Sequence, residues 1–124
     1  MAKKILVVDD ESDMTATLKD IFQSRGYQVF VANDGEEAIS KMRSMSPDLV
    51  ILDIVMPKMS GLEVAKTLRS DKSFREIPII MLTARTDIED TKEGLALGAA
   101  AYVAKPFQTA TLLGIVGGLI GAGV

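Results

Sequence analysis

The chain has 124 residues, of which 48% are apolar and 25% charged, so residues 1–124 are predicted to fold as a single globular domain. Its net charge is -3 and no basic block stands out, which argues against a binding surface for DNA or RNA. Cysteine and histidine are absent, which excludes disulfides, thiolate or imidazole metal ligands, and catalysis by either residue.

The N-terminal third predicts two strand–helix units. Residues 5–8 are an apolar run that predicts a strand; the run is too short for a signal peptide, so a cytoplasmic protein is expected. Ser12 is placed to cap the helix that follows, and Gly26 ends that helix. Residues 27–31 predict a second strand, and a second helix begins within residues 33–36.

A third strand is predicted at residues 48–53, where a run of branched apolar residues indicates burial on both faces of a sheet. Asp53 closes this run, and Pro57 and Gly61 then turn the chain. Residues 60–63 have the Ser-x-x-Glu form of a capping box and open a third helix.

The C-terminal part predicts two further strand–helix units. Residues 77–82 form a fourth strand, and residues 86–89 are a second capping box that opens a helix ending at Gly98. Residues 101–104 predict a short fifth strand. The last helix runs from Thr109 to about Ile120 within a Gly-rich segment at about 108–121.

Five strand–helix units with right-handed crossovers predict a parallel sheet with helices on both faces. The fold class is therefore α/β: a flavodoxin-like (βα)5 three-layer sandwich with strand order 2-1-3-4-5. Strands 1 and 3 are neighbours at the switch point, so Asp9, Asp10 and Asp53 should share one crevice. Thr83 and Lys105 end strands 4 and 5 at the same edge.

Three carboxylates in one crevice repel one another, which raises their pKa values unless a cation intervenes. With only oxygen ligands available, the expected cofactor is Mg²⁺ or Mn²⁺. Such a site favours phosphoryl transfer, with Asp53 as the nucleophile that forms an acyl phosphate. Lys105 and the hydroxyl of Thr83 would bind the remaining negative charge.

Each of these residues also has a purely structural explanation. Asp53 can cap the loop after its strand, and residues 9–11 are acidic as the start of a helix favours. Lys105 can form an ion pair, and Thr83 can bond to its own loop. The occurrence of all these residue types at one sheet edge favours a shared site.

The chain resembles the receiver domain of two-component response regulators over about residues 3–107. The matching motifs are Val7-Val8-Asp9-Asp10-Glu11, residues 47–53 with Met56-Pro57 and Gly61, residues 78–84, Gly98-Ala99, and residues 102–107. Both their order and their spacing fit. The resemblance implies a signalling phosphoprotein of a two-component system.

The resemblance also implies a magnesium site and a backbone feature. Mg²⁺ (or Mn²⁺) would be held by Asp10, Asp53 and the backbone carbonyl of Val55, with Asp9 acting mainly through water. The Lys105–Pro106 peptide bond would be cis, which the sequence alone allows for any bond before proline.

By the same resemblance, Asp53 accepts a phosphoryl group from a sensor histidine kinase or a histidine phosphotransfer protein. Thr83 and Lys105 would contact that group. Thr83 would move toward it, and Tyr102 would rotate into the vacated space and change the surface of helix 4, strand 5 and helix 5. The alternative for Tyr102 is a half-buried aromatic residue with an exposed hydroxyl.

The last helix departs from the family pattern, because no charge follows Lys105. A bulky stripe should dock on the sheet (Leu112, Ile115, Val116, Leu119 and Ile120), and a second stripe should face outward (Gly114, Gly117, Gly118 and Gly121). Each interior glycine costs about 0.8–1 kcal/mol relative to alanine, so this helix is intrinsically weak. The outward stripe suggests a homodimer contact; a frayed tail or the start of a linker is the alternative.

The expected function is a phosphoacceptor switch and not a turnover enzyme, with at most slow autodephosphorylation. An aspartate-nucleophile phosphatase would place a second Asp at Val55, and a flavin- or nucleotide-binding domain would need a Gly-rich loop in place of residues 9–11. The remaining alternative is a stand-alone or degenerate receiver-like interaction module that works without phosphorylation. Neither nucleic acid nor a membrane is an expected partner.

Overall fold

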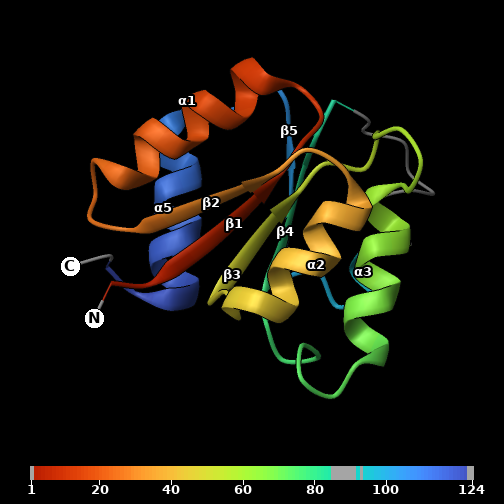
Figure 1. The fold of residues 1–124 in the computed structure, drawn as a ribbon. Coiled ribbons are helices and arrows are strands. Elements are labelled where there is room, and N and C mark those ends of the chain that lie inside the picture. The colour runs from red at the N-terminus through yellow and green to blue at the C-terminus, as the bar shows by residue number, and fades with distance from the viewer. Residues whose placement is uncertain (1, 85–91, 93, 123–124) are drawn as a thin grey trace.

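Five parallel strands form one sheet in the order β2-β1-β3-β4-β5 in the computed structural model, which describes residues 2–84, 92 and 94–122 (Figure 1). The strands are β1 (Lys4–Val8), β2 (Gln28–Ala32), β3 (Leu49–Leu52), β4 (Ile79–Thr83) and β5 (Ala101–Ala104). The helices are α1 (Ser12–Gln23), α2 (Gly35–Met45), α3 (Gly61–Ser70) and α5 (Thr109–Ile120). The predicted fold class and strand order are confirmed.

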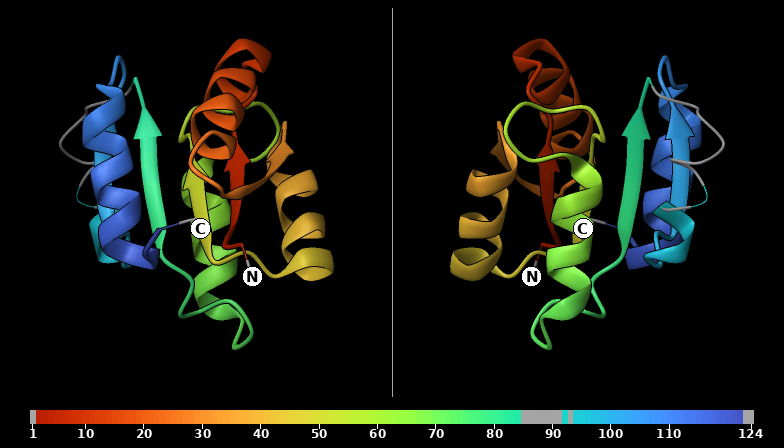
Figure 2. Two further views of the ribbon diagram at one scale, coloured as in Figure 1. Left: turned by 90° about the vertical axis from the view of Figure 1, so that its left-hand side faces the viewer. Right: turned by 90° about the vertical axis from the view of Figure 1, so that its right-hand side faces the viewer.

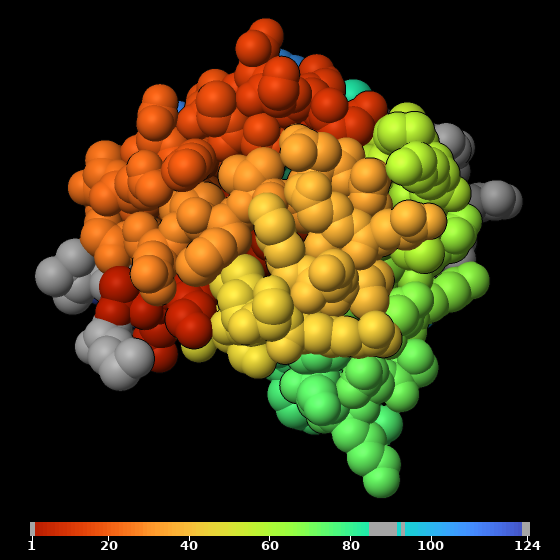
Figure 3. Space-filling model, viewed as in Figure 1, coloured from red at the N-terminus to blue at the C-terminus, as the bar shows by residue number. Residues whose placement is uncertain are grey.

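Two hydrophobic cores cover the two faces of the sheet, as the alternation of side chains along each strand requires. In β1, Leu6 and Val8 pack toward α2 and α3, whereas Ile5 and Val7 pack toward α1 and α5. All four side chains are at most 1% exposed. Figure 2 shows the resulting three layers, and in the space-filling view of Figure 3 α2 and α3 lie side by side on the near face.

One predicted cap, at Ser60, is confirmed, and Asp34 is a further cap that lies within the predicted helix start at residues 33–36. Asp34 accepts a hydrogen bond from the backbone N–H of Glu37 at 2.8 Å and caps α2. Ser60 accepts one from Glu63 at 3.3 Å and caps α3. The predicted capping box at residues 86–89 lies outside the described residues.

The predicted cap at Ser12 is wrong. Ser12 is the first residue of α1, and Glu11 occupies the capping position without a side-chain hydrogen bond. The carboxylate of Asp9, the residue after β1, accepts a hydrogen bond from the backbone N–H of Glu11 at 2.9 Å and so stabilises the turn before α1. The predicted ends of the first four strands also differ from the observed ones, by one or two residues, whereas residues 101–104 match.

The last helix docks through fewer residues than predicted. Leu112 and Val116 are fully buried against the sheet, but Leu119 is 39% exposed, so its predicted docking is wrong. Leu119 lies in the last turn, beyond Val116, which is the last fully buried residue of α5. The predicted outward stripe is confirmed at Gly114, Gly118 and Gly121, which are exposed, and Gly117 is partly exposed. Within the described ranges, no helix combines the length and the apolar character that a membrane crossing demands.

A hydrogen bond joins the end of α5 to the segment between α1 and β2. The hydroxyl of Tyr27 donates to the carbonyl oxygen of Gly121 at 2.6 Å. Tyr27 is only 7% exposed, and burial raises the pKa of its hydroxyl because the charged phenolate is poorly solvated there.

The substitution Tyr27→Phe is expected to lower the unfolding free energy by about 0.5–1.5 kcal/mol near neutral pH, because one hydrogen bond is lost. Since the folded-state pKa is raised, the stabilisation by the hydroxyl is fully present below about pH 10 and is lost as pH rises through that pKa. Urea unfolding of both proteins between about pH 8 and pH 11 should therefore show the difference shrinking. A difference that stays constant over this range would assign the effect to packing instead.

Candidate functional site

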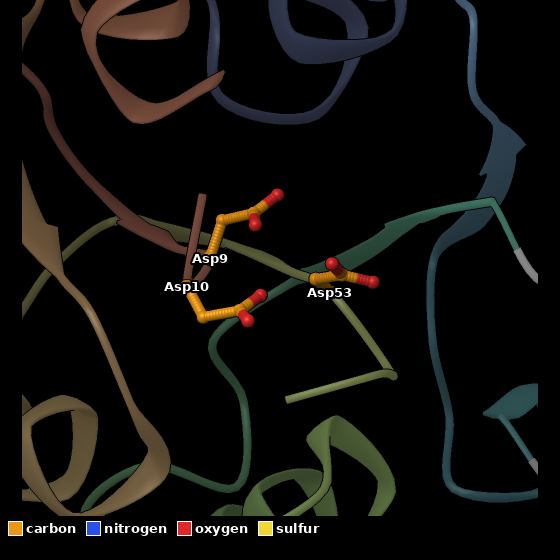
Figure 4. Close-up of side chains that lie close together, drawn as sticks. All are labelled: Asp9, Asp10 and Asp53. Carbon is orange, nitrogen blue, oxygen red and sulfur yellow. The ribbon is translucent and has the colours of Figure 1, made fainter. Parts of the chain in front are cut away.

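Three carboxylates converge where β1 and β3 end. Asp9 and Asp10 follow β1, Asp53 follows β3, and one carboxylate oxygen of each lies within 4.8 Å of the others (Figure 4). Asp9 is 2% exposed and Asp53 5% exposed, whereas Asp10 is open to solvent. The predicted convergence of these three residues is confirmed.

A buried cation lies among these carboxylates. The side-chain nitrogen Nζ of Lys105, which follows β5, is 2.6 Å from Oδ2 of Asp9 and 3.2 Å from Oδ2 of Asp53. It is also 3.5 Å from Oε1 of Glu11, whose side chain is 65% exposed. The lysine side chain itself is only 9% exposed, so its charge is offset by the two buried aspartates and not by water.

The pKa values of this pair are both displaced upward. Burial raises the pKa of the Asp9 carboxyl, and the hydrogen bond from Lys105 opposes that shift without cancelling it. Burial by itself would lower the pKa of Lys105, but the hydrogen bond to Asp9 and the charge of Asp53 raise it above the ordinary lysine value. Lys105 is therefore positively charged at neutral pH and can hold an anion.

A hollow of about 450 Å³ opens beside the carboxylates. Its lining comes from the ends of four strands and comprises Asp10, Glu11, Asp53, Val55, Thr83, Ala84 and Lys105. Thr83 has no exposed surface, whereas Val55 is 50% exposed at the rim. The structure therefore brings the predicted acceptor, the lysine and the threonine to one cavity.

Gly61 has a role that the sequence did not reveal. The turn after Asp53 is closed by a hydrogen bond from the Gly61 N–H to the carbonyl of Ile54 at 2.9 Å. A Cβ atom on Gly61 would lie 2.1 Å from the backbone oxygen of Asp53, which no side chain can tolerate. Gly61 is thus required for the close approach of α3 to the backbone that carries Asp53, and not only for a turn.

Two further predicted features lie in β5 and directly after it. The Lys105–Pro106 peptide bond is cis, as expected. Tyr102 of β5 is half-buried and packs against the core on the α2–α3 face, with its ring beside Gly94.

The oxygen donors fit a hard divalent cation, because the described residues of the cluster offer carboxylate oxygens. Both oxygens of Asp9 already accept hydrogen bonds, one from the Glu11 N–H and one from Lys105. Asp10 is the more open ligand, and Oδ1 of Asp53 accepts a long bond, 3.2 Å, from the Val55 N–H. Asp10 and Asp53 are therefore better placed for direct coordination than Asp9.

Comparison with known sequences gives one consistent result. A family model described as the response regulator receiver domain matches residues 5–117. The alkaline phosphatase synthesis transcriptional regulatory protein PhoP of Bacillus subtilis (strain 168) is 48% identical over 108 residues, which are 87% of this chain and 44% of that protein. The DNA-binding response regulator MtrA of Mycobacterium tuberculosis (H37Rv) is 40% identical over 113 residues, 91% of this chain and 48% of that protein. The chain spans less than half the length of these two relatives.

Solved structures share the whole fold. The chemotaxis protein CheY4 of Vibrio cholerae superimposes with a TM-score of 0.90 at 36% identity, covering 96% of this chain and 99% of that one. The response regulator protein TrrA of Thermotoga maritima, in complex with Mg²⁺-BeF, gives a TM-score of 0.85 at 44% identity, covering 94% and 98%. A protein similar to this one therefore holds Mg²⁺ together with a beryllofluoride group.

Proposed function

This chain belongs to the response regulator receiver domain family of two-component signalling, and on that premise we propose that Asp53 is its phosphoacceptor. The donor is a sensor histidine kinase or a histidine phosphotransfer protein, and the cofactor is Mg²⁺ or Mn²⁺. The observation that carries the proposal is the position of the Asp53 carboxylate, which lies 3.2 Å from Lys105 and within 4.8 Å of two other carboxylates.

The residues around Asp53 have separable roles in this proposal. A carboxylate oxygen of Asp53 attacks phosphorus, a new O–P bond forms, and the bond from phosphorus to the donor's leaving group breaks as that group takes up a proton. The Lys105 ammonium and the Thr83 hydroxyl hold phosphoryl oxygens. Asp10, Asp53 and the Val55 carbonyl hold the metal ion, with Asp9 acting through water. The ion supplies positive charge against the oxygens of the transferring group.

The same surroundings favour a long-lived modification over turnover. Val55, two residues after Asp53, is apolar and 50% exposed, so it supplies no general acid for rapid hydrolysis. We therefore assign the protein to signalling phosphoacceptors with at most slow autodephosphorylation. Phosphorylation would draw Thr83 toward the phosphoryl group, turn Tyr102 inward, and change the surface of the predicted fourth helix, β5 and α5, which is also the proposed homodimer contact.

An alternative function is a receiver-like interaction module that works without phosphorylation. The observation in its favour is the uncharged, glycine-exposing surface of α5. In either case residues 1–124 act as one receiver domain in the cytoplasm, and this chain itself contacts neither DNA nor a membrane. The DNA-binding and transcriptional roles that the names of MtrA and PhoP state belong to proteins of more than twice the matched length.

Incubation with acetyl phosphate and Mg²⁺ is expected to add about 80 Da, the mass of one phosphoryl group, to the intact protein. Asp53→Asn should abolish the adduct, because an amide oxygen is not an effective nucleophile. Asp20→Asn, which changes an exposed aspartate of α1, is the matched control and should leave the adduct unchanged. An adduct that persists in Asp53→Asn would reject Asp53 as the acceptor, and its absence from the unaltered protein would favour the alternative module.

A further inference from the structure

Arg69, in the last turn of α3, binds main-chain carbonyls at the end of the sheet where the strands begin, opposite the phosphoryl site. Its guanidinium donates four hydrogen bonds: Nε to the carbonyl of Leu97 at 2.8 Å, Nη1 to Arg75 at 2.9 Å and to Ile77 at 2.9 Å, and Nη2 to Gly98 at 3.1 Å. A guanidinium has five N–H donors, so four of them are committed to the backbone.

The four carbonyls belong to two segments that each lead into a strand. Arg75 and Ile77 lie in the loop between α3 and β4, which projects from the bottom of the molecule in Figures 1 and 3. Leu97 and Gly98 follow the helical residues 94–96 and precede β5. One side chain therefore binds the backbone just before both β4 and β5.

The surroundings of Arg69 favour lasting hydrogen bonds between its guanidinium and the backbone carbonyls. Burial lowers the pKa of Arg69, and the charge of Glu76 acts in the opposite direction. The desolvated charge is offset mainly by carbonyl dipoles, which a planar fork of donors matches better than a single ammonium. Gly98 adopts φ +80°, a conformation that strains any residue with a Cβ, and a Cβ there would contact Nε of Arg69 at 3.4 Å.

The hydrogen bonds between β4 and β5 connect the end of the sheet that Arg69 binds to the phosphoryl site at the other end. The first links the Ala100 N–H to the Ile79 carbonyl at 2.8 Å, and the last links the Lys105 N–H to the Thr83 carbonyl at 3.0 Å. β5 has four residues and is paired on one side only, so its neighbours in the sheet constrain it less than they constrain β1 or β3. An error in where β5 begins would displace Lys105.

We propose that Arg69 is a positioning residue for the phosphoryl site. By fixing the starts of β4 and β5 relative to each other, it sets Thr83 and Lys105 side by side where these two strands end. Its importance for phosphorylation rests on the proposed function, but its structural effect does not. The competing explanation is that strand pairing alone fixes the register and that Arg69 adds only general stability.

The test compares Arg69→Met with Arg75→Met, which removes the exposed neighbouring arginine and leaves its backbone carbonyl in place. Amide hydrogen exchange is measured by NMR without phosphate or metal. Loss of the four bonds should accelerate exchange at the Lys105 amide about tenfold or more in Arg69→Met. The Asp53 amide, which bonds to the Val8 carbonyl at the same edge of the sheet, should change much less. Arg75→Met should behave like the unaltered protein.

A second measurement is beryllofluoride affinity in the presence of Mg²⁺, which should weaken several-fold in Arg69→Met and be partly restored in Arg69→Lys. Equal acceleration at the Lys105 and Asp53 amides, or none at Lys105, would overturn the proposal in favour of general stability. If Arg69→Met does not fold, Gly98→Ala disturbs the same attachment from the other side and should give the same pattern. If the unaltered protein fails to bind beryllofluoride while the exchange pattern appears, the proposed function fails and the positioning role stands.

Discussion

Replacing Gly61 by alanine is expected to lower the unfolding free energy by about 3 kcal/mol or more, at the upper end of the cost of overpacking. The added Cβ would lie 2.1 Å from the backbone oxygen and 2.8 Å from the carbonyl carbon of Asp53. These atoms are backbone, so relief requires moving either the start of α3 or the residue that carries the acceptor carboxylate. Acetyl phosphate labelling should therefore fall even under conditions in which the variant remains folded.

Urea unfolding gives the free energy, and intact mass gives the labelling. Gly114→Ala is the matched control, because the same change is made in a helix where nothing lies within 4 Å of the new Cβ. The two substitutions should move the stability in opposite directions. A Gly61→Ala protein that is as stable as the parent and is labelled normally would contradict the close-approach explanation.

The second large effect is expected in α5, where alanine at Gly114, Gly117 and Gly118 together should raise the unfolding free energy by about 1–3 kcal/mol. None of the three would place a Cβ within 4 Å of another part of the protein, and none has a positive φ. The gain comes from the smaller backbone entropy of the unfolded chain, in a helix that has no side-chain cap and no charged residue in its first or last turn.

Gly121→Ala is the control for this series. Gly121 has φ +81°, so alanine there should destabilise the protein although there is space for it.

Sedimentation of the triple variant also tests the proposed homodimer, because methyl groups on the exposed face would weaken a contact that depends on close helix approach. A triple variant that is less stable than the parent would indicate that this face is already packed against a second copy.

The fold was predictable because its determinants are local. Short runs of branched apolar residues such as 49–52 alternate with helical periodicity, and right-handed crossovers leave few arrangements of such units. The convergence of Asp9, Asp10 and Asp53 follows from the same reasoning, since parallel strands end at one edge. Lys105 was placed at that edge by its position after β5, but its bonds to two carboxylates required the structure.

The features that were missed depend on contacts between distant residues. Ser12 is the favoured cap by residue type, but α1 already begins at Ser12, and Glu11 occupies the cap position with its N–H donated to the Asp9 carboxylate. Leu119 has the helical spacing of a core residue but lies past the end of the buried face. Arg69 reaches carbonyls up to 29 residues away, and no local pattern marks such a partner.

The dependence of Asp53 labelling on a divalent cation tests the central claim most directly. Intact mass is followed during reaction with acetyl phosphate, in excess chelator and over a series of Mg²⁺ concentrations, for the parent and for Asp10→Asn. The account predicts no adduct in chelator, saturation as Mg²⁺ rises, and a higher Mg²⁺ requirement in Asp10→Asn, with the phosphoryl group mapped to Asp53. Labelling that proceeds equally well without any divalent cation, or that maps to another residue, would contradict it.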